Sequence, residues 1–236
     1  MNQLIKLSIN DFKLIFRDPT LRIFLLLPIL FFVLTLWFLP NLVEQYEAII
    51  PYLPLIVIFA MVENTQGFCF LCTMVFVDEK ETNVAKVYGV LPVGKKAFIL
   101  SRLVIPYLLT LFLNALFLYL QAFFEISFFY VIMIPALFAL LVPAYVLIIN
   151  VIVKNRMEGM MYIKVLNIFV LIPFAAFFVP DTFKHAFGLF PTHWLFQGTE
   201  NLLLDKNPLL FLFLGFILLM ILLWYFTNRF VKIHFE

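Results

Sequence analysis

Few residues in this chain of 236 have types and positions that could carry chemistry, and the most conspicuous is Glu63. It lies near the middle of an apolar run from about residue 52 to 77, with Asn64 and Gln66 beside it. An ionisable group at the centre of a bilayer is costly, so it should face the protein interior or a wet cavity. Glu63 is therefore a candidate site residue.

Two interpretations of these polar residues remain open. Glu63, Asn64 and Gln66 could line a substrate path or a contact with a second chain, with Asn114 and Asn167 as weaker candidates. Alternatively, they could form interhelical hydrogen bonds, which commonly join membrane helices.

Other reactive patterns are weak. Residues 89–96 carry the glycines and lysine of a phosphate-binding loop, but Lys96 stands where a Ser or Thr hydroxyl is required. The three histidines lack Cys or carboxylate partners at metal-ligand spacing, and Cys69 and Cys72 lie inside an apolar run as packing residues. We therefore predict no catalytic residue, no metal and no cofactor in this chain.

The composition indicates an all-α polytopic membrane protein. Apolar residues make up 65% of the chain and charged residues only 13%, about half the usual share in soluble domains. Six runs are long enough to cross a bilayer. We place them at about 21–39, 52–77, 97–124, 127–153, 162–179 and 209–227, within one transmembrane domain covering 1–236. We expect Pro40 to close the first run.

The basic residues predict the orientation. Of the 16 Lys and Arg residues, all but Lys184 and Lys206 lie in or next to four regions. These regions are before the first run, after the second, after the fourth and after the last. Such a bias marks the cytoplasmic side, so both termini should be cytoplasmic in an inner-membrane protein. The net charge of +2 reflects this topology, and no contiguous basic stripe suggests nucleic-acid binding.

Three segments outside the spans have distinct patterns. Residues 1–18 suit a helix lying in the membrane interface, with Asp18 capping the span that Pro19 begins. Residues 181–207 are too polar to cross yet apolar enough to dip into the outer leaflet as a re-entrant segment. Residues 78–92 predict a short cytoplasmic helix with an acidic start and one face formed by Val84, Val87 and Tyr88. That face could meet another protein or lie on lipid headgroups.

Together these segments resemble the permease subunits of type-2 ATP-binding-cassette exporters, almost from end to end. The resemblance is carried by Phe16-Arg17-Asp18-Pro19 before the first run, Glu79-Lys80-Glu81-Thr82 after the second, and Val90-Leu91-Pro92-Val93 before the third. Pro191 and Trp194 stand in the segment that resembles the outer re-entrant hairpin of such permeases. Asn83 departs from the pattern, because a small turn residue is common there.

The resemblance implies a function and its partners. Residues 79–92 would be a coupling helix that docks on a separate ATPase subunit, which would hold ATP and Mg, and the N-terminal helix would brace this contact. The implied contact residues are Glu79, Lys80, Glu81, Thr82, Val84, Val87, Tyr88, Val90, Leu91 and Pro92. Two permease chains, identical or related, would line a path in the bilayer for a hydrophobic or amphipathic drug-like compound, lipid or peptide.

Alternatives of other classes remain. A membrane enzyme or an ATP-independent carrier would need several converging acids, bases or metal ligands, whereas only Glu63 is ionisable at mid-bilayer. An assembly or immunity protein of the same fold could instead sequester a peptide or lipid without transporting it.

Overall fold

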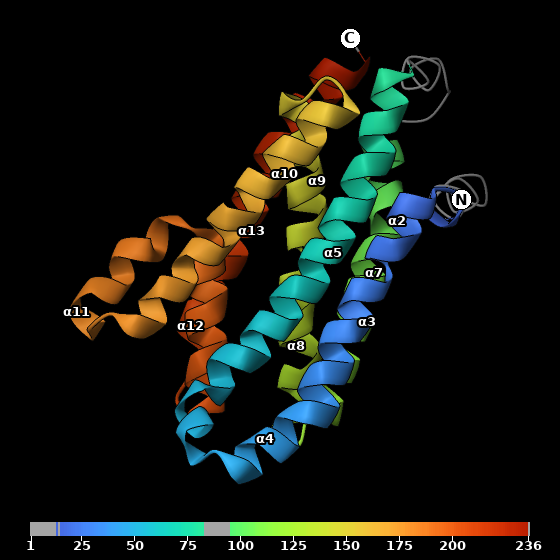
Figure 1. Cartoon of the computed structure of the whole chain (residues 1–236). Coiled ribbons are helices and arrows are strands. Elements are labelled where there is room, and N and C mark those ends of the chain that lie inside the picture. Colours follow the sequence, from blue (N-terminus) through green and yellow to red (C-terminus); the bar gives the residue numbers. More distant parts are fainter. Residues whose placement is uncertain (1–12, 14, 83–94, 236) are drawn as a thin grey trace.

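Helices form the whole of the regular structure over residues 13, 15–82 and 95–235, which the computed structural model describes. Six helical segments are long and apolar enough to span a membrane (Figure 1). Fully apolar helices suit a bilayer because their backbone groups are satisfied within the segment. The predicted fold class is confirmed.

The first span continues beyond its predicted end. It consists of α2 (Pro19–Phe24), α3 (Leu26–Val33), the π-helical turn η1 (Leu34–Phe38) and α4 (Leu39–Gln45). Pro40 does not close this span, because it lies in the first turn of α4, where its missing N–H breaks no helical hydrogen bond. The π-turn before it accommodates the change in helical register.

The second span is the central helix of the bundle. It begins with the 3-10 turn η2 (Glu47–Tyr52) and continues as α5 (Leu53–Glu81), past the predicted end at Val77. The 29 residues of α5 correspond to about 43 Å, which exceeds the hydrocarbon thickness of a bilayer. Figure 1 shows α5 running through the middle of the molecule beside α3.

The third and fourth spans form an antiparallel hairpin. They are α7 (Lys95–Leu120), followed by α8 (Phe128–Ala139) and α9 (Leu141–Ile152), which meet at Leu140. Helix α7 ends before the predicted Phe124 because the Gln121 side chain organises a turn. Its amide nitrogen donates to the Phe124 carbonyl at 2.6 Å, and its oxygen accepts from the Phe123 and Phe124 N–H groups at 2.9 Å.

The fifth span, α10 (Arg156–Leu171) and η3 (Ile172–Phe178), begins before the predicted Tyr162. Asn155 caps α10 by accepting from the Glu158 N–H at 2.9 Å, and the Glu158 carboxylate accepts from the Lys154 N–H at 2.9 Å. The arrangement resembles a capping box, except that the Glu158 carboxylate bonds one residue before the cap, and it sets the helix start at polar residues outside the apolar run.

The last part of the chain folds back before the sixth span. It contains α11 (Asp181–Lys184), η4 (His185–Leu189), α12 (Pro191–Leu203) and α13 (Leu209–Phe235). Helix α12 runs back along α13, and α11 lies at the far side of this hairpin (Figure 1). Gly198 makes the close packing possible, since a Cβ there would lie 2.6 Å from Leu212 Cδ2.

Helix ends that carry basic residues gather at one end of the bundle. Helices α5, α9 and α13 end there, and α7 and α10 begin there (Figure 1). We call this the basic end; it contains Lys80, Lys95, Lys96, Arg102, Lys154, Arg156, Arg229 and Lys232. The turn between α4 and η2 lies at the opposite end.

Candidate functional site

An ion pair at the basic end joins α5 to α7. The Arg102 guanidinium donates two hydrogen bonds to the Glu79 carboxylate, at 2.7 and 2.6 Å. Both side chains are buried, with 1% and 8% of their surfaces exposed. The guanidinium also lies 4.4 Å from the Phe76 ring centroid and 5.5 Å from that of Phe98. Planar stacking and the bidentate bond fix Arg102 in one orientation.

Lys80 connects the same turn of α5 to the end of α9. Its ammonium group donates to the carbonyl oxygens of Asn150 at 3.0 Å and Val153 at 2.6 Å. These carbonyls lie at a helix C-terminus, where the dipole favours a positive charge.

Arg156, at the start of α10, makes the third group of polar contacts at the basic end. Its guanidinium donates to Asp18 at 2.6 Å and to Asp78 at 3.3 Å, and its backbone N–H donates to Glu81 at 2.9 Å. The first, second and fifth spans are thereby linked at the basic end.

The predicted coupling segment begins inside α5. Glu79, Lys80 and Glu81 lie in the last turn of α5 and not at the start of a separate helix, and Thr82 caps that turn through a 2.8 Å bond from its hydroxyl to the Asp78 carbonyl. The acidic residues thus have partners within the chain, and their predicted contact with an ATPase stays a prediction. The other predicted contact residues, Val84, Val87, Tyr88, Val90, Leu91 and Pro92, lie outside the described residues.

The turn before the first span has the predicted geometry in its described part. Pro19 is the first residue of α2, and Asp18 accepts a long 3.4 Å hydrogen bond from the Leu21 N–H. Phe16 and Arg17 are exposed. Residues 1–12 and 14 of the predicted interfacial helix lie outside the described residues.

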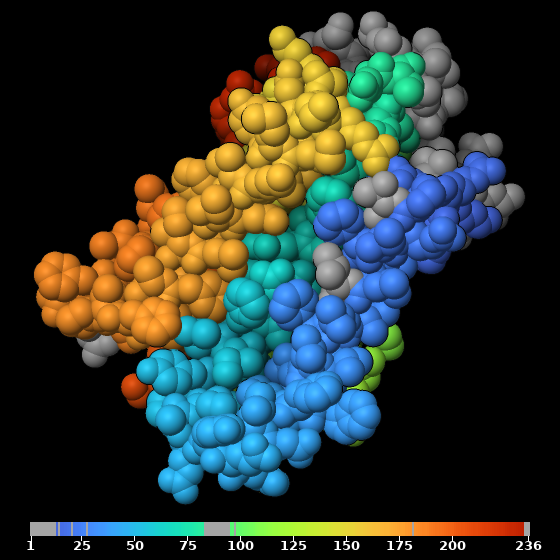
Figure 2. All heavy atoms as spheres, in the orientation of Figure 1, coloured from blue at the N-terminus to red at the C-terminus, as the bar shows by residue number. Residues whose placement is uncertain are grey.

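Glu63 lies in a half-buried row along α5. Residues Ile56, Phe59, Glu63, Gly67 and Phe70 recur at helical spacing and are all intermediate in exposure, whereas most of their neighbours on α5 are buried. We call this row the α5 stripe. Figure 2 shows the α5 surface set back in a hollow between the first span and α10.

Aromatic contacts place the α5 stripe between these two walls. The Phe59 ring lies 6.1 Å from Phe31 of α3 and 5.8 Å from Phe174 of η3, and Phe70 lies 4.3 Å from Phe24. Glu63 lies in the middle of this stripe, and among the described residues that form the row it is the one with a charged side chain.

Asn64 and Asn114 lie on the other side of α5 and are fully buried. The Asn64 amide donates to the Asn114 side-chain oxygen at 2.7 Å, and the Asn114 amide donates to the Thr65 hydroxyl at 3.0 Å. Both bonds join α5 to α7. This geometry favours the interhelical hydrogen-bonding interpretation for these two residues and separates them from Glu63.

Gln66 and Asn167 join α5 to α10 in a second contact. The Gln66 amide donates to the Asn167 carbonyl at 3.5 Å, and the Tyr145 hydroxyl of α9 donates to the Asn167 side chain. Three spans thus meet at Asn167. The predicted polar residues therefore divide into Glu63 in the hollow and two sets of structural hydrogen bonds.

Residues 181–207, the predicted re-entrant segment, contain an aromatic cluster around Trp194. Its indole N–H donates to the Gly188 carbonyl at 2.7 Å, and its ring stacks on His185 at 6.1 Å. His193 is fully buried beside them, and neither of its ring nitrogens has a hydrogen-bond partner among the described residues. Burial, with His185 and Lys184 nearby, lowers the pKa of His193 to about 4.

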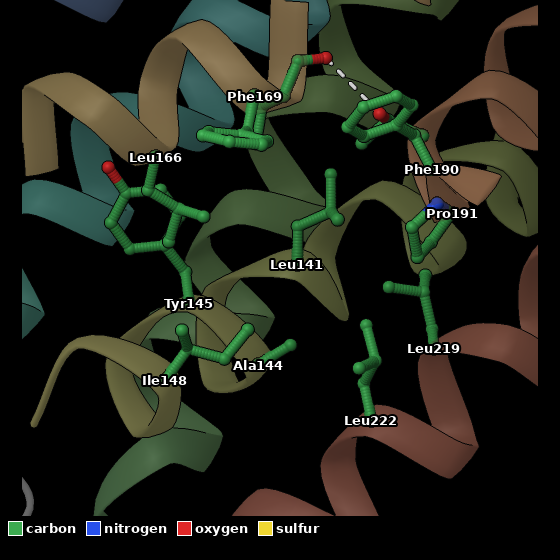
Figure 3. Close-up of a pocket in the computed structure, with 12 residues that line it drawn as sticks. Leu141, Ala144, Tyr145, Ile148, Leu166, Phe169, Phe190, Pro191, Leu219 and Leu222 are labelled. Carbon is green, nitrogen blue, oxygen red and sulfur yellow. Dashed lines mark hydrogen bonds between the residues drawn. The ribbon is translucent and has the colours of Figure 1, made fainter. Parts of the chain in front are cut away.

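Pro191, the other residue predicted for this segment, lines an apolar cavity of about 170 Å³. Figure 3 shows the cavity between α9, α10, α13 and the start of α12, with Tyr145, Phe169 and Leu219 among its walls. Thr192 donates to the Val170 carbonyl at 3.2 Å, so its hydroxyl is satisfied. An apolar space of this size can hold a single ring-sized apolar group.

Sequence reasoning missed Arg102, Arg156 and Tyr145 as contact residues. Arg102 offered a signal, because it stands inside the third apolar run, where a charge requires a partner. Arg156 and Tyr145 offered none, since their partners are distant in the sequence.

The fold and these sites define a multi-pass helical membrane protein with one acidic side chain in an apolar hollow. Residues 11–227 match the family described as "Fluoroquinolones export permease protein Rv2686c-like", and the chain belongs to this family. It is thus a permease of an export family and a transport component rather than an enzyme. No curated protein and no solved structure matches it.

Proposed function

We propose that this chain is the membrane subunit of an ATP-binding-cassette exporter of type 2. A separate ATPase subunit would drive it, and two permease chains, identical or related, would form the path. The cargo would be a hydrophobic or amphipathic compound, with the fluoroquinolones named by the family as the first candidates. Both termini would be cytoplasmic, in the inner membrane.

The observation that carries this proposal is the position of Glu63 in the hollow. A single carboxylate among aromatic and aliphatic side chains can recognise a cationic group on an otherwise apolar compound, because its charge is poorly screened there. The hollow lies between the first and fifth spans, which bury little of their apolar surface within one chain. A second chain on these spans would enclose the hollow as a path.

The test is drug efflux by Glu63→Gln. Cells that express the chain with its ATPase subunit are loaded with a fluorescent fluoroquinolone, and the rate of loss is measured. We expect a decrease of about tenfold, the effect of removing one charge-assisted contact of about 1.5 kcal/mol. The matched control is Glu47→Gln, an exposed carboxylate in η2. Normal efflux by Glu63→Gln would exclude a role in the path.

The ATPase partner requires a different variant. Charge reversal at Glu79 is unsuitable, because it would break the buried pair with Arg102 and disturb the bundle itself. The double variant Val87→Asp and Tyr88→Asp changes the apolar face predicted for the coupling helix. We expect it to abolish co-purification of the ATPase, while the double control Phe183→Asp and Leu189→Asp, at two exposed residues of the predicted outer segment, does not. Retained association would contradict the docking proposal.

The same experiments separate the alternatives. A sequestering protein would bind its ligand without efflux, and an ATP-independent carrier would continue to export when the ATPase subunit is omitted.

A further inference from the structure

A groove opens on the bundle surface between α7, α9 and α13. Its volume is about 450 Å³, and its walls are mainly aliphatic, including Leu100, Val104, Leu140, Pro143, Met220 and Leu223. We call it the α7–α13 groove. Its lining runs from Lys96 to Tyr107 on α7, about 16 Å along that helix, which is roughly half the hydrocarbon thickness of a bilayer.

The groove has a cationic mouth at the basic end. Lys96 and Asn228 line it, and an adjoining cavity of about 260 Å³ shares Trp224 and Asn228 and adds Arg229 and Lys232. Three cationic side chains thus line one end of the α7–α13 groove and its adjoining cavity. None of the described residues that line the two cavities is an Asp or Glu.

We propose that the α7–α13 groove binds an anionic phospholipid from the leaflet at the basic end. One acyl chain lies in the groove, and the phosphate contacts Lys96, Arg229 and Lys232. Trp224, which is 71% exposed, lies at the headgroup level, where tryptophan is favoured. Basic pockets between membrane helices recognise lipid headgroups by this combination of charge and apolar depth.

The second apolar cavity provides an internal comparison. The cavity lined by Tyr145, Phe169 and Pro191 has no charged residue in its lining (Figure 3). It can take an apolar group but cannot select a headgroup. The cations that would select an anionic headgroup thus distinguish the α7–α13 groove from this cavity, and the proposal does not depend on transport or on an ATPase.

Lipid retention measured by native mass spectrometry tests this proposal. The purified, delipidated chain is incubated in detergent with phosphatidylglycerol or with phosphatidylcholine of the same acyl chains. We expect phosphatidylglycerol to be retained preferentially. Each cation near a membrane surface contributes about fivefold, so Lys96→Gln, Arg229→Gln and Lys232→Gln combined should weaken retention by more than about tenfold.

Two further variants provide a control and a separate test of the site for the acyl chain. Lys164→Gln removes an exposed lysine of α10, away from the groove, and should leave retention unchanged. Val104→Trp keeps all three cations but fills the groove, and it should also weaken phosphatidylglycerol retention. Equal retention of both lipids, or full retention by the triple variant or by Val104→Trp, would overturn the proposal.

Discussion

Glu79 of α5 and Arg102 of α7 form a buried, bidentate ion pair. The bidentate bond pairs both carboxylate oxygens, and the Phe76 and Phe98 rings cover the guanidinium. Such a pair need not stabilise the fold relative to apolar residues, but removing one partner leaves a buried charge unpaired. The interaction thus sets the register of α7 against α5.

A single substitution in this pair should be more harmful than a double one. We expect Arg102→Met to lower the free energy of unfolding by about 3–5 kcal/mol, because Glu79 then remains buried without its cation. Replacing both residues, with Glu79→Met and Arg102→Leu, should recover most of this loss. Thermal unfolding in detergent measures both, and a double variant less stable than Arg102→Met would contradict the argument.

His193 predicts a pH dependence. Its pKa in the folded protein is about 4, below the usual value near 6.5, because of burial and the nearby His185 and Lys184. The unfolded chain therefore binds the proton first as the pH falls. The free energy of unfolding is therefore highest above about pH 6.5 and decreases by about 3 kcal/mol as the pH falls towards 4.

His193→Phe should remove this dependence. The ring shape is nearly retained, and no hydrogen bond to a described residue is lost, so stability at pH 7.5 should change little. The melting temperatures of both proteins are compared between pH 7.5 and 4.5. A parallel decrease in the two proteins would assign the pH effect to other groups.

At the scale of elements, two glycines allow helices to approach closely, with different tolerance. A Cβ at Gly198 would lie 2.6 Å from Leu212 Cδ2 and 3.2 Å from the Leu212 backbone nitrogen. A Cβ at Gly159 would lie 3.0 Å from Met74 Cε, the end of a flexible side chain. Of these two contacts, only the one at Gly198 involves a backbone atom of the neighbouring helix.

Alanine at these two positions should therefore have unequal effects. Gly198→Ala should destabilise the protein by about 1–3 kcal/mol, since α12 must move away from α13. Gly159→Ala should cost less than about 1 kcal/mol, because Met74 can change its rotamer. Fluorescence-detected thermal unfolding provides the comparison, and equal shifts would show that α12 is free to move.

Apolar runs predicted the six spans well because their length is a direct physical requirement of the bilayer. Their ends were predicted less well, because the ends depend on polar side chains. Gln121 ends α7 early, and Asn155 with Glu158 begins α10 early. Pro40 failed as a stop signal because the π-turn before it changes the register.

The polar site was predicted in part. Glu63 was identified by its cost in an apolar run, but the direction of each side chain depends on packing that the sequence does not contain. Asn64 and Glu63 are adjacent in sequence but face different neighbours, since Asn64 bonds to Asn114 of α7 and Glu63 lies in the half-buried stripe. The acidic residues of 78–81 are bonded to Arg102 and Arg156 within the chain, which the sequence did not indicate, and their contact with a partner stays a prediction.

On the whole-molecule scale, α10 separates two apolar spaces. The hollow of the α5 stripe lies on one side of it and the cavity with Tyr145 and Phe169 on the other. Hydrogen bonds join α10 to its neighbours along most of its length, at Arg156, Ile163, Asn167 and Val170. Helix α10 is therefore held from its first residue to near its end, and this fixes the boundary between the two spaces.

The gathering of basic helix ends predicts opposite accessibility for the two ends of the molecule. Lys232 lies at the basic end, and Asn207 lies in the α12–α13 turn at the other end; both side chains are exposed. Lys232→Cys should react with an impermeant maleimide only in inside-out vesicles, and Asn207→Cys only in intact spheroplasts. The native Cys69 and Cys72 are buried and give little background. Labelling of Lys232→Cys from outside would reverse the orientation, and the basic end would then be out of reach of any cytoplasmic ATPase.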